Sequence, residues 1–365
     1  MFNTPKFYSL KNILSKNAQY NIIFGERSNG KTYSVLKYAL EKYAKTGEQL
    51  AIVRRWQDDF TGKRGQTMFD ALVSNNVIAK ATNSEWTNVY YYGSRWFLCY
   101  YDENNKRVID DQPFAYGFSL TSMEHDKSTS YPNITTILFD EFLTRQTYIP
   151  DEFVLFMNVI STIIRQRNNV KIFMLGNTVN KYCPYFNEMG LKHISKMNQG
   201  DIDVYKYGDS KLTVAVEYAS PTKKGKDSDL YFAFDNPKLQ MITGGAWELD
   251  IYPHSPIKIK PADILFTYYI EFDGETLQAD IVFSDVKEII FTFIHLKTTP
   301  IKDPDNSLIF TTDYSANPNH IRNITKPTTN ITKKIYQHFR TDKVFYSTNE
   351  VGEVMRNYLL WCKSN

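Results

Sequence analysis

The sequence predicts an α/β domain built around a parallel sheet with helices on both faces, followed by a second domain that is rich in strands. The first observation is an apolar strand at 20–24, a helix at about 31–45 and another strand at 49–53, an order that is typical of parallel sheets. Two more apolar strands are expected at 134–139 and 170–175. Farther along the chain, several strand patterns follow one another without helices between them.

The two helices of the first domain are predicted from their periodicity. Gly47 is expected to end the first, and the second is expected to begin near Asp151, between the last two apolar strands. In each, apolar residues recur at the spacing that places them on one side of a helix. These positions are Val35, Leu36, Ala39, Leu40 and Tyr43 in the first helix, and Phe153, Phe156, Met157, Ile160 and Ile164 in the second.

Residues 86–118 do not follow the strand–helix alternation. Two aromatic segments flank Gly93-Ser94, a dipeptide that suits a two-residue hairpin turn, and DENNK at 102–106 supplies a second turn. We interpret this region as an antiparallel insertion in the first domain.

Domain boundaries are predicted from a change in composition near residue 200. The polar run SPTKKGKDSD at 220–229 is typical of an exposed loop. The later part has strand patterns at 264–272, 277–283 and 288–296 and a basic helical stretch at 349–362. We expect a first domain at 1–200 with its insertion near 86–118, a linker region at 201–235, and a C-terminal α+β domain at 236–365.

The bulk composition excludes several classes of protein. The chain has 365 residues, of which 42% are hydrophobic and 23% charged, so general disorder is not expected. Three cysteines without a CxxC pair favour a reducing cytoplasm over a disulfide framework. An apolar leader and an apolar run of roughly 18 residues are both missing, so we expect no membrane span. Residues 319–365 carry 8 Lys and Arg against 3 Asp and Glu, which fits either a phosphate-binding face or an ordinary solvated helix surface.

The loop after the first strand carries the most specific motif. Residues 25–32, GERSNGKT, match GxxxxGK[ST], the P-loop pattern of nucleotide-binding proteins. Main-chain N–H groups of such a loop surround phosphates, a lysine reaches the terminal phosphates, and a threonine hydroxyl binds Mg²⁺. We therefore expect ATP to be bound by Gly25, Arg27, Ser28, Asn29, Gly30, Lys31 and Thr32, and Mg²⁺ by Thr32.

The strand at 134–139 is followed by two adjacent carboxylates. Asp140 is expected to hold Mg²⁺ through its water shell, and Glu141 to polarise the attacking water as a general base. The presence of Glu141 as a general base next to Asp140 favours an ATP-hydrolysing motor over a switch or a kinase. The sequence therefore predicts an ATPase.

Three further residues suit the same reaction. Asn177, after the strand at 170–175, is a candidate sensor of the γ-phosphate, or else part of an ordinary turn. Arg165 and Arg167, at the end of the preceding helix, are candidates for an arginine finger that reaches a neighbouring subunit. Alternatively, these arginines are cations that favour a helix C-terminus, and Arg27 acts in cis instead.

Four segments resemble, in order and spacing, the DNA-packaging ATPases of phi29-type tailed phages. These are relatives of terminase large subunits among the P-loop ring translocases with a catalytic glutamate, which are of the RecA-like class. The resemblance covers roughly residues 20–180. Its segments are VRRW at 53–56, HDKSTSYPNITTILFDEF at 125–142, IIRQR at 163–167 and GNT at 176–178.

The resemblance implies a homo-oligomeric ring of five subunits that sits at the portal of a phage prohead in the host cytoplasm. It would pump double-stranded DNA inward, and whether a structural RNA takes part is left open. Lys31, Thr32, Asp140, Glu141 and Asn177 would hold the roles given above, and Arg165 or Arg167 would be the finger in trans. Lys127 would face a subunit boundary, and Arg54 and Arg55 would lie near nucleotide or DNA, or be structural.

The later part of the chain resembles the family in its layout only, which implies a C-terminal domain similar to RNase H-type nucleases. Its carboxylates Asp263, Glu271, Asp273, Asp280 and Asp313 form no tight metal motif, so we expect a vestigial domain that binds DNA or the portal. Sequence-independent phosphate contacts are expected from Lys223, Lys224, Lys226, Arg322, Lys326, Lys333 and Lys334. The alternatives are a terminase with an active nuclease and an ATP-binding scaffold with little hydrolysis.

Overall fold

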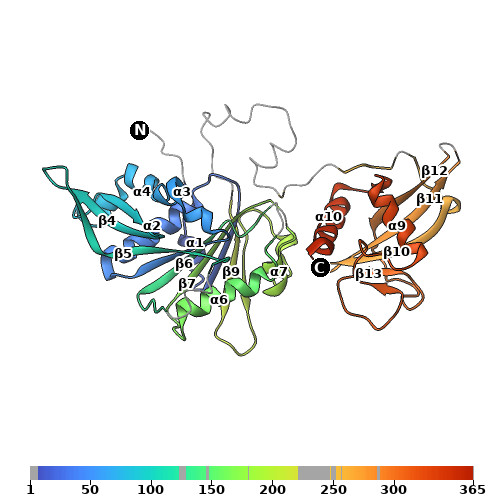
Figure 1. Cartoon of the computed structure of the whole chain (residues 1–365). Coiled ribbons are helices and arrows are strands. Elements are labelled where there is room, and N and C mark those ends of the chain that lie inside the picture. Colours follow the sequence, from blue (N-terminus) through green and yellow to red (C-terminus); the bar gives the residue numbers. More distant parts are fainter. Residues whose placement is uncertain are drawn as a thin grey trace. The chain divides into compact units, whose positions relative to one another are not determined.

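The computed structural model describes residues 7–122, 129–144, 148–179, 181–220, 247, 252–255, 257–285 and 288–364. The chain divides into two compact units, Met1–Glu248 and Leu249–Asn365 (Figure 1). Among the described residues, no helix is long and apolar enough to cross a membrane.

The described residues of the first unit form one sheet of nine strands. They are β1 Tyr20–Gly25, β2 Gln49–Arg54, β3 Asn88–Tyr92, β4 Arg95–Tyr101, β5 Arg107–Ser119, β6 Ile134–Asp140, β7 Lys171–Asn177, β8 Ile202–Lys206 and β9 Thr213–Tyr218. Their order is β3-β4-β5-β2-β6-β7-β1-β9-β8. The central strands, from β5 to β9 in this order, all pair in parallel, which confirms the predicted parallel sheet.

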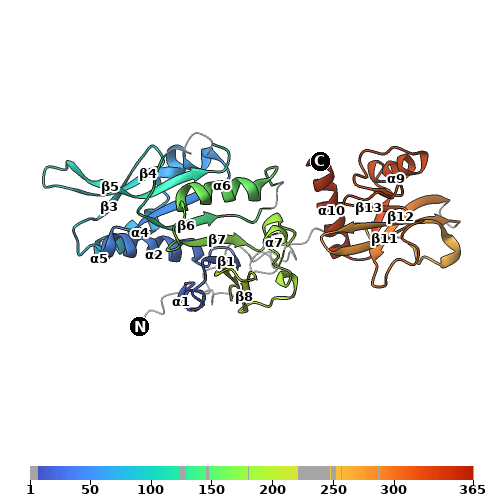
Figure 2. The same cartoon turned by 90° about the horizontal axis from the view of Figure 1, so that it is seen from below.

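Helices cover both faces of this sheet. They are α1 Lys11–Leu14, α2 Lys31–Thr46, α3 Gly62–Gln66, α4 Asp70–Ser74, α5 Val77–Ala81, α6 Glu152–Ile164 and α7 Pro184–Glu188. The buried residues of α2 and α6 belong to two different core clusters, and Figure 2 shows β6 and β7 between the two helices. Because strand side chains alternate between faces, Ile22 and Phe24 of β1 join the core cluster of α6, while Ile23 joins that of α2.

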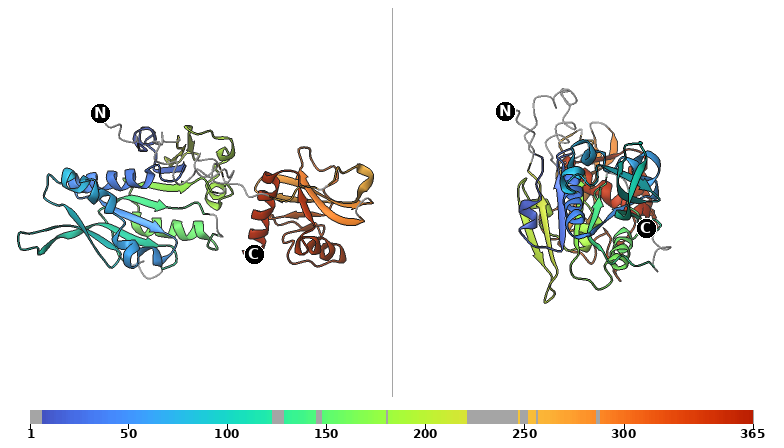
Figure 3. Two further views of the ribbon diagram at one scale, coloured as in Figure 1. Left: turned by 90° about the horizontal axis from the view of Figure 1, so that it is seen from above. Right: turned by 90° about the vertical axis from the view of Figure 1, so that its left-hand side faces the viewer.

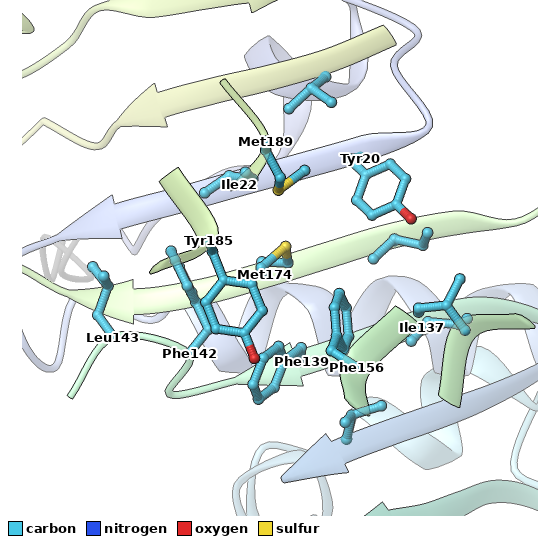
Figure 4. Close-up of a cluster of buried hydrophobic side chains, with 14 of the residues drawn as sticks. Tyr20, Ile22, Ile137, Phe139, Phe142, Leu143, Phe156, Met174, Tyr185 and Met189 are labelled. Carbon is cyan, nitrogen blue, oxygen red and sulfur yellow. The ribbon is translucent and has the colours of Figure 1, made fainter. Parts of the chain in front are cut away.

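The ends of the two long helices are set by residues that adopt left-handed backbone angles. Gly47 has φ +72° and its N–H donates to the carbonyl of Tyr43 over 2.8 Å, so the expected stop of α2 is confirmed. Asp151 has φ +53° and immediately precedes α6, as the sequence predicted. On the α6 face, the ring of Tyr185 lies among Phe139, Phe142 and Phe156 (Figure 4).

The antiparallel insertion forms one edge of the sheet. Strands β3 and β4 are joined by Gly93-Ser94, with φ of +57° and +59°, and Tyr92 pairs with Arg95, so the predicted two-residue turn is confirmed. Strand β5 pairs antiparallel with β4 and then continues beside β2 in parallel. The insertion is therefore continuous with the main sheet, at the edge opposite β8 and β9 (Figure 3).

The linker region expected at 201–235 was placed too early in the chain, because its first residues belong to the sheet of the first unit. Strands β8 and β9 lie in that range, and β9 pairs in parallel with β1 next to the P-loop. The prediction was wrong here because two strands, at 202–206 and 213–218, were too short and too polar at their ends to stand out from a loop. Lys223, Lys224 and Lys226 of the same range lie outside the described residues, as does Lys127.

The second unit is a six-stranded sheet with two described helices. Its elements are β10 Ile264–Phe272, β11 Glu275–Ser284, β12 Ile289–Leu296, β13 Ile309–Thr311, β14 His320–Ile321, α9 Asn330–Arg340, β15 Val344–Tyr346 and α10 Asn349–Ser364. The order is β14-β13-β10-β11-β12-β15. Strands β10, β11 and β12 form an antiparallel meander, and β13 and β15 add to it in parallel. The three strands and the C-terminal helix that the sequence predicted are all present; α9 was not predicted.

Candidate nucleotide-binding site

The three sequence motifs meet at one edge of the first sheet. Parallel pairing places Gly25 of β1 beside Asn177 of β7, and Asp140 of β6 beside Leu175 of β7. The carboxyl ends of these strands therefore lie side by side, which is where open α/β sheets bind their ligands. Segments that are separated by roughly 110 and 35 residues in the chain are brought together by strand order alone.

Two glycines of the P-loop have backbone angles that residues with a side chain rarely adopt. Gly25 has φ +150°, and a Cβ atom there would lie 3.1 Å from the carbonyl oxygen of Ala219. Gly30 has φ +90°, and a Cβ atom there would lie 3.2 Å from the Cβ of Phe7. Only glycine avoids both the strain and the close contacts. Helix α2 starts at the next residue, so its N-terminal N–H groups and positive dipole end face the same space.

Lys31 is the buried cation of the loop. Its Nζ donates to the carbonyl of Glu26 over 2.7 Å and to Oδ1 of Asn29 over 3.2 Å, and lies 3.5 Å from Oδ1 of Asn177. Burial lowers the pKa of Lys31 to about 8, although Asp140 opposes the shift. The hydrogen-bond partners of the Lys31 ammonium are uncharged oxygens, so a bound phosphate would add a favourable charge interaction.

Thr32 and Asp140 provide oxygen ligands close to one another. The Thr32 hydroxyl donates to Oδ1 of Asp140 over 3.2 Å. Burial raises the pKa of Asp140, whereas the charge of Arg54 and the Thr32 hydroxyl act against this shift. A hydroxyl and a carboxylate at hydrogen-bond distance are the donors that Mg²⁺ binds, directly or through water, so these residues fit that ion.

Arg54 neutralises both acids of the site. Its guanidinium lies 2.8 Å from Oδ2 of Asp140 and 2.8 Å from Oε2 of Glu141. Glu141 itself has φ +60°, and its side chain is 67% exposed toward the cavity. The resemblance left Arg54 either near nucleotide or DNA or in a structural role. Its partners could not be found from spacing, because β2 and β6 are neighbours only in the folded sheet.

Two adjoining cavities surround these groups. A cavity of about 300 Å³ is lined by the loop from Ser28 to Thr32 together with Asp140, Glu141 and Asn177. A second, of about 480 Å³, shares Glu141 and Asn177 and adds Arg27, Arg54 and Arg55. Of the predicted nucleotide residues, the five from Ser28 to Thr32 line the first cavity and Arg27 lines the second, whereas Gly25 lines neither.

The two candidate finger arginines lie at the opposite end of β6. Arg167 donates to five main-chain carbonyls at 2.7–3.1 Å, those of Tyr131, Pro132, Ile134, Ile163 and Ile164. Arg165 is exposed and donates to the carbonyl of Thr129 over 2.9 Å. Neither contacts the cavity of its own chain, because Ile134 begins the strand that Asp140 ends.

The described C-terminal candidates are spread over a different unit. Lys326, Lys333 and Lys334 are exposed. Arg322 donates to the carbonyl of Thr312 over 3.0 Å, and its guanidinium lies 3.9 Å from the ring centre of Tyr314. Within the described part of the chain, no three His, Cys, Asp or Glu side chains come together in a group able to hold a metal ion.

Strand order, glycine loop, buried lysine and paired acids together define a P-loop nucleotide-binding protein. Comparison with known proteins gives the family. Residues 2–241 match the family of podovirus DNA encapsidation proteins (Gp16), and the chain belongs to this family.

Individual relatives agree with this assignment. The DNA packaging protein of Bacillus phage phi29 is 25% identical over 274 residues, which cover 74% of each chain. The solved phi-29 viral genome packaging motor assembly is similar over 98% of this chain and 99% of that one, with a TM-score of 0.56 and 22% identity. The phi-28 gp11 DNA packaging motor matches over 98% of both chains, with a TM-score of 0.54 and 18% identity. These structures support the fold along nearly the whole chain.

Proposed function

We propose that this chain is the ATP-hydrolysing subunit of a motor that moves double-stranded viral DNA through a portal into a preformed prohead. The observation that carries the proposal is the meeting of Lys31, Thr32, Asp140, Glu141 and Asn177 at one sheet edge. Membership of the encapsidation family supplies the biological setting.

Binding of ATP is assigned to the P-loop. Main-chain N–H groups of residues 25–32 and the start of α2 surround the phosphates, and the Lys31 ammonium pairs with the terminal ones. Mg²⁺, held by Thr32 and Asp140, would offset the charge of the phosphate oxygens. Arg27 and Ser28, both exposed beside the cavity, are expected to contact the triphosphate from its outer side.

Hydrolysis is assigned to Glu141. Its exposed carboxylate stands at the mouth of the cavity, where it can orient a water and accept its proton. Asn177 is assigned as the γ-phosphate sensor, because its Oδ1 lies 3.5 Å from the Nζ of Lys31. Movement of Lys31 upon loss of the terminal phosphate would therefore reach β7 directly.

Arg165 is the better candidate for the finger in trans. Arg167 uses its guanidinium on five carbonyls, so freeing it would remove a donor from all five, including those of the buried Ile134 and Ile163. Arg165 is exposed, and it lies at the end of β6 that is remote from its own cavity. A neighbouring subunit in a ring would present its site to this end.

The assembly is proposed as a homo-oligomeric ring, with five subunits as the working number, docked at the prohead in the host cytoplasm. A structural RNA is an additional candidate partner. The second unit is proposed as an RNase H-like domain without nuclease activity that contacts DNA phosphates or the portal. Arg322, Lys326, Lys333 and Lys334 are the described candidates for phosphate contacts, and Lys223, Lys224 and Lys226 the others.

The test is packaging of labelled DNA into purified proheads, with ATP turnover measured in parallel. Glu141→Gln is expected to lower turnover by about 10³-fold or more and to retain ATP binding, because only the base is lost. Lys31→Ala is expected to lose both binding and packaging. Lys37→Ala, an exposed change on the same helix, serves as the control and should behave as wild type. Nuclease-protected DNA with Lys31→Ala would contradict the proposal.

A further inference from the structure

A buried ion pair lies directly behind the turn that carries Glu141. Arg55 follows β2, and Glu152 is the first residue of α6; these residues are 8% and 2% exposed. The Arg55 Nε atom donates to Oε2 of Glu152 over 2.9 Å, and Nη2 lies 2.8 Å from Oε1. The guanidinium and carboxylate thus form a two-point pair, the arrangement that arginine makes best.

The carboxylate of this pair has no capacity left for a ligand. Oε1 also accepts from the Tyr185 hydroxyl over 2.8 Å, and Oε2 from the N–H of Ile149 over 2.9 Å. Four donors saturate a carboxylate. Glu152 is therefore a fixed structural anchor and is not a candidate base or metal ligand.

The other side of the guanidinium holds the strand end that carries the catalytic acids. Nη1 of Arg55 donates to the main-chain oxygen of Glu141, and Nη2 donates to that of Phe142. The rings of Tyr148 and Phe139 lie 5.1 and 5.7 Å from the guanidinium carbon and limit its movement. One side chain therefore joins the end of β2, the turn after β6 and the start of α6.

The turn at Glu141 depends on such support. Glu141 has φ +60°, a conformation that is unfavourable for a residue with a side chain. Its carboxylate is mostly exposed, so packing does not fix its direction. Two contacts then set the direction of the side chain: the ion pair of its carboxylate with Arg54, and the backbone, which Arg55 holds at two successive carbonyls.

We propose that Arg55 and Glu152 are positioning residues for hydrolysis: their buried pair holds the turn that aims Glu141 at the attacking water. This rests on the proposed function, since it assumes that Glu141 is the general base. It assigns a role to Arg55 that differs from that of a nucleotide or DNA contact. Lysine cannot replace this arginine, because one ammonium has no planar fork to span a carboxylate and two carbonyls.

The experiment uses the full-length chain with Arg55→Lys and Glu152→Gln, each keeping approximate size and most polarity. Turnover number, KM, the dissociation constant of ATPγS and the melting temperature are measured for each variant. We expect the turnover number to fall about 30- to 100-fold, because small misplacements of a catalytic group cost about this much. KM and the ATPγS dissociation constant are expected to stay within about threefold, because the P-loop is not touched.

Two controls separate positioning from general destabilisation. Ile160→Val removes a methylene from the buried face of α6 without contacting the pair, and it should lower the melting temperature but not the turnover number of folded protein. The double variant Arg55→Met, Glu152→Met replaces the pair by apolar side chains. It should recover melting temperature relative to either Arg55→Met or Glu152→Met alone, because no unpaired charge is left, and still turn over slowly.

Each outcome decides the matter. If the double variant regains both melting temperature and turnover, or if Arg55→Lys turns over as wild type does, the pair only stabilises the fold and the proposal is wrong. If KM rises while the turnover number stays constant, the pair serves binding and the proposal is again wrong. A wild-type chain without turnover, or an active Glu141→Gln, would instead overturn the proposed function itself.

Discussion

The two ends of strand β6 treat charge in opposite ways. At its carboxyl end, Asp140 faces Arg54 and Thr32, so an anion is balanced by side chains that can exchange partners with a ligand. At its amino end, Arg167 is balanced by five main-chain carbonyls that belong to the fold itself. At this strand, the anion whose partners are side chains can exchange them for a ligand, whereas the cation that is held by main-chain carbonyls is committed to structure.

Arg165 is the expected exception to this contrast. It lies at the amino end of β6, yet it is proposed to act in the site of the neighbouring subunit. Arg165→Ala is expected to lower ATP turnover of assembled motors about 10³-fold, the usual size of an arginine-finger effect. Thermal melting should change little, because the side chain is exposed. Mixing Arg165→Ala with Glu141→Gln subunits provides the check. Recovery of part of the turnover in mixed rings would place the arginine in trans, and its absence would contradict this assignment.

Arg167 should show the reverse behaviour. Arg167→Lys leaves several carbonyls without their donor and is expected to destabilise the first unit by about 2 kcal/mol. Turnover per folded molecule should remain near wild type. Chemical denaturation together with ATPase assays would measure both quantities. A large loss of turnover with an unchanged denaturation midpoint would return Arg167 to the list of catalytic candidates.

The smallest expected effect is a pH dependence of ATP binding at the other end of the strand. Burial lowers the pKa of Lys31 to about 8, and the negative charge of bound phosphates would raise it again. Below pH 8 the ammonium is already charged, so affinity should be flat. Above pH 8 binding must take up a proton, so affinity should fall by up to about tenfold per pH unit. Lys31→Arg should bind weakly but without this slope, and calorimetric titration across pH 7–9.5 tests both.

Much of this molecule was open to prediction from local patterns. The P-loop spacing, the apolar strands and the helical periods of α2 and α6 each lie within a short stretch of chain, and their physical causes are local. Gly47 and Gly93-Ser94 were predicted for the same reason, since a left-handed backbone angle selects its residues locally. The strands at 202–206 and 213–218 were missed because their apolar runs were short and only their pairing with β1 and with each other stabilises them.

In the candidate site, too, some features follow from local sequence and others only from the folded structure. The sequence by itself determined which residues could hold phosphate, magnesium and water, because those roles depend on residue type within contiguous motifs. The tertiary structure alone decided that Arg54 faces both acids, that Arg55 and Glu152 hold the turn behind them, and that Arg167 is tied to backbone. The physical reason is that charge partners are selected by distance in space, and the order of strands in a parallel sheet, which sets those distances, is not the order of strands in the chain.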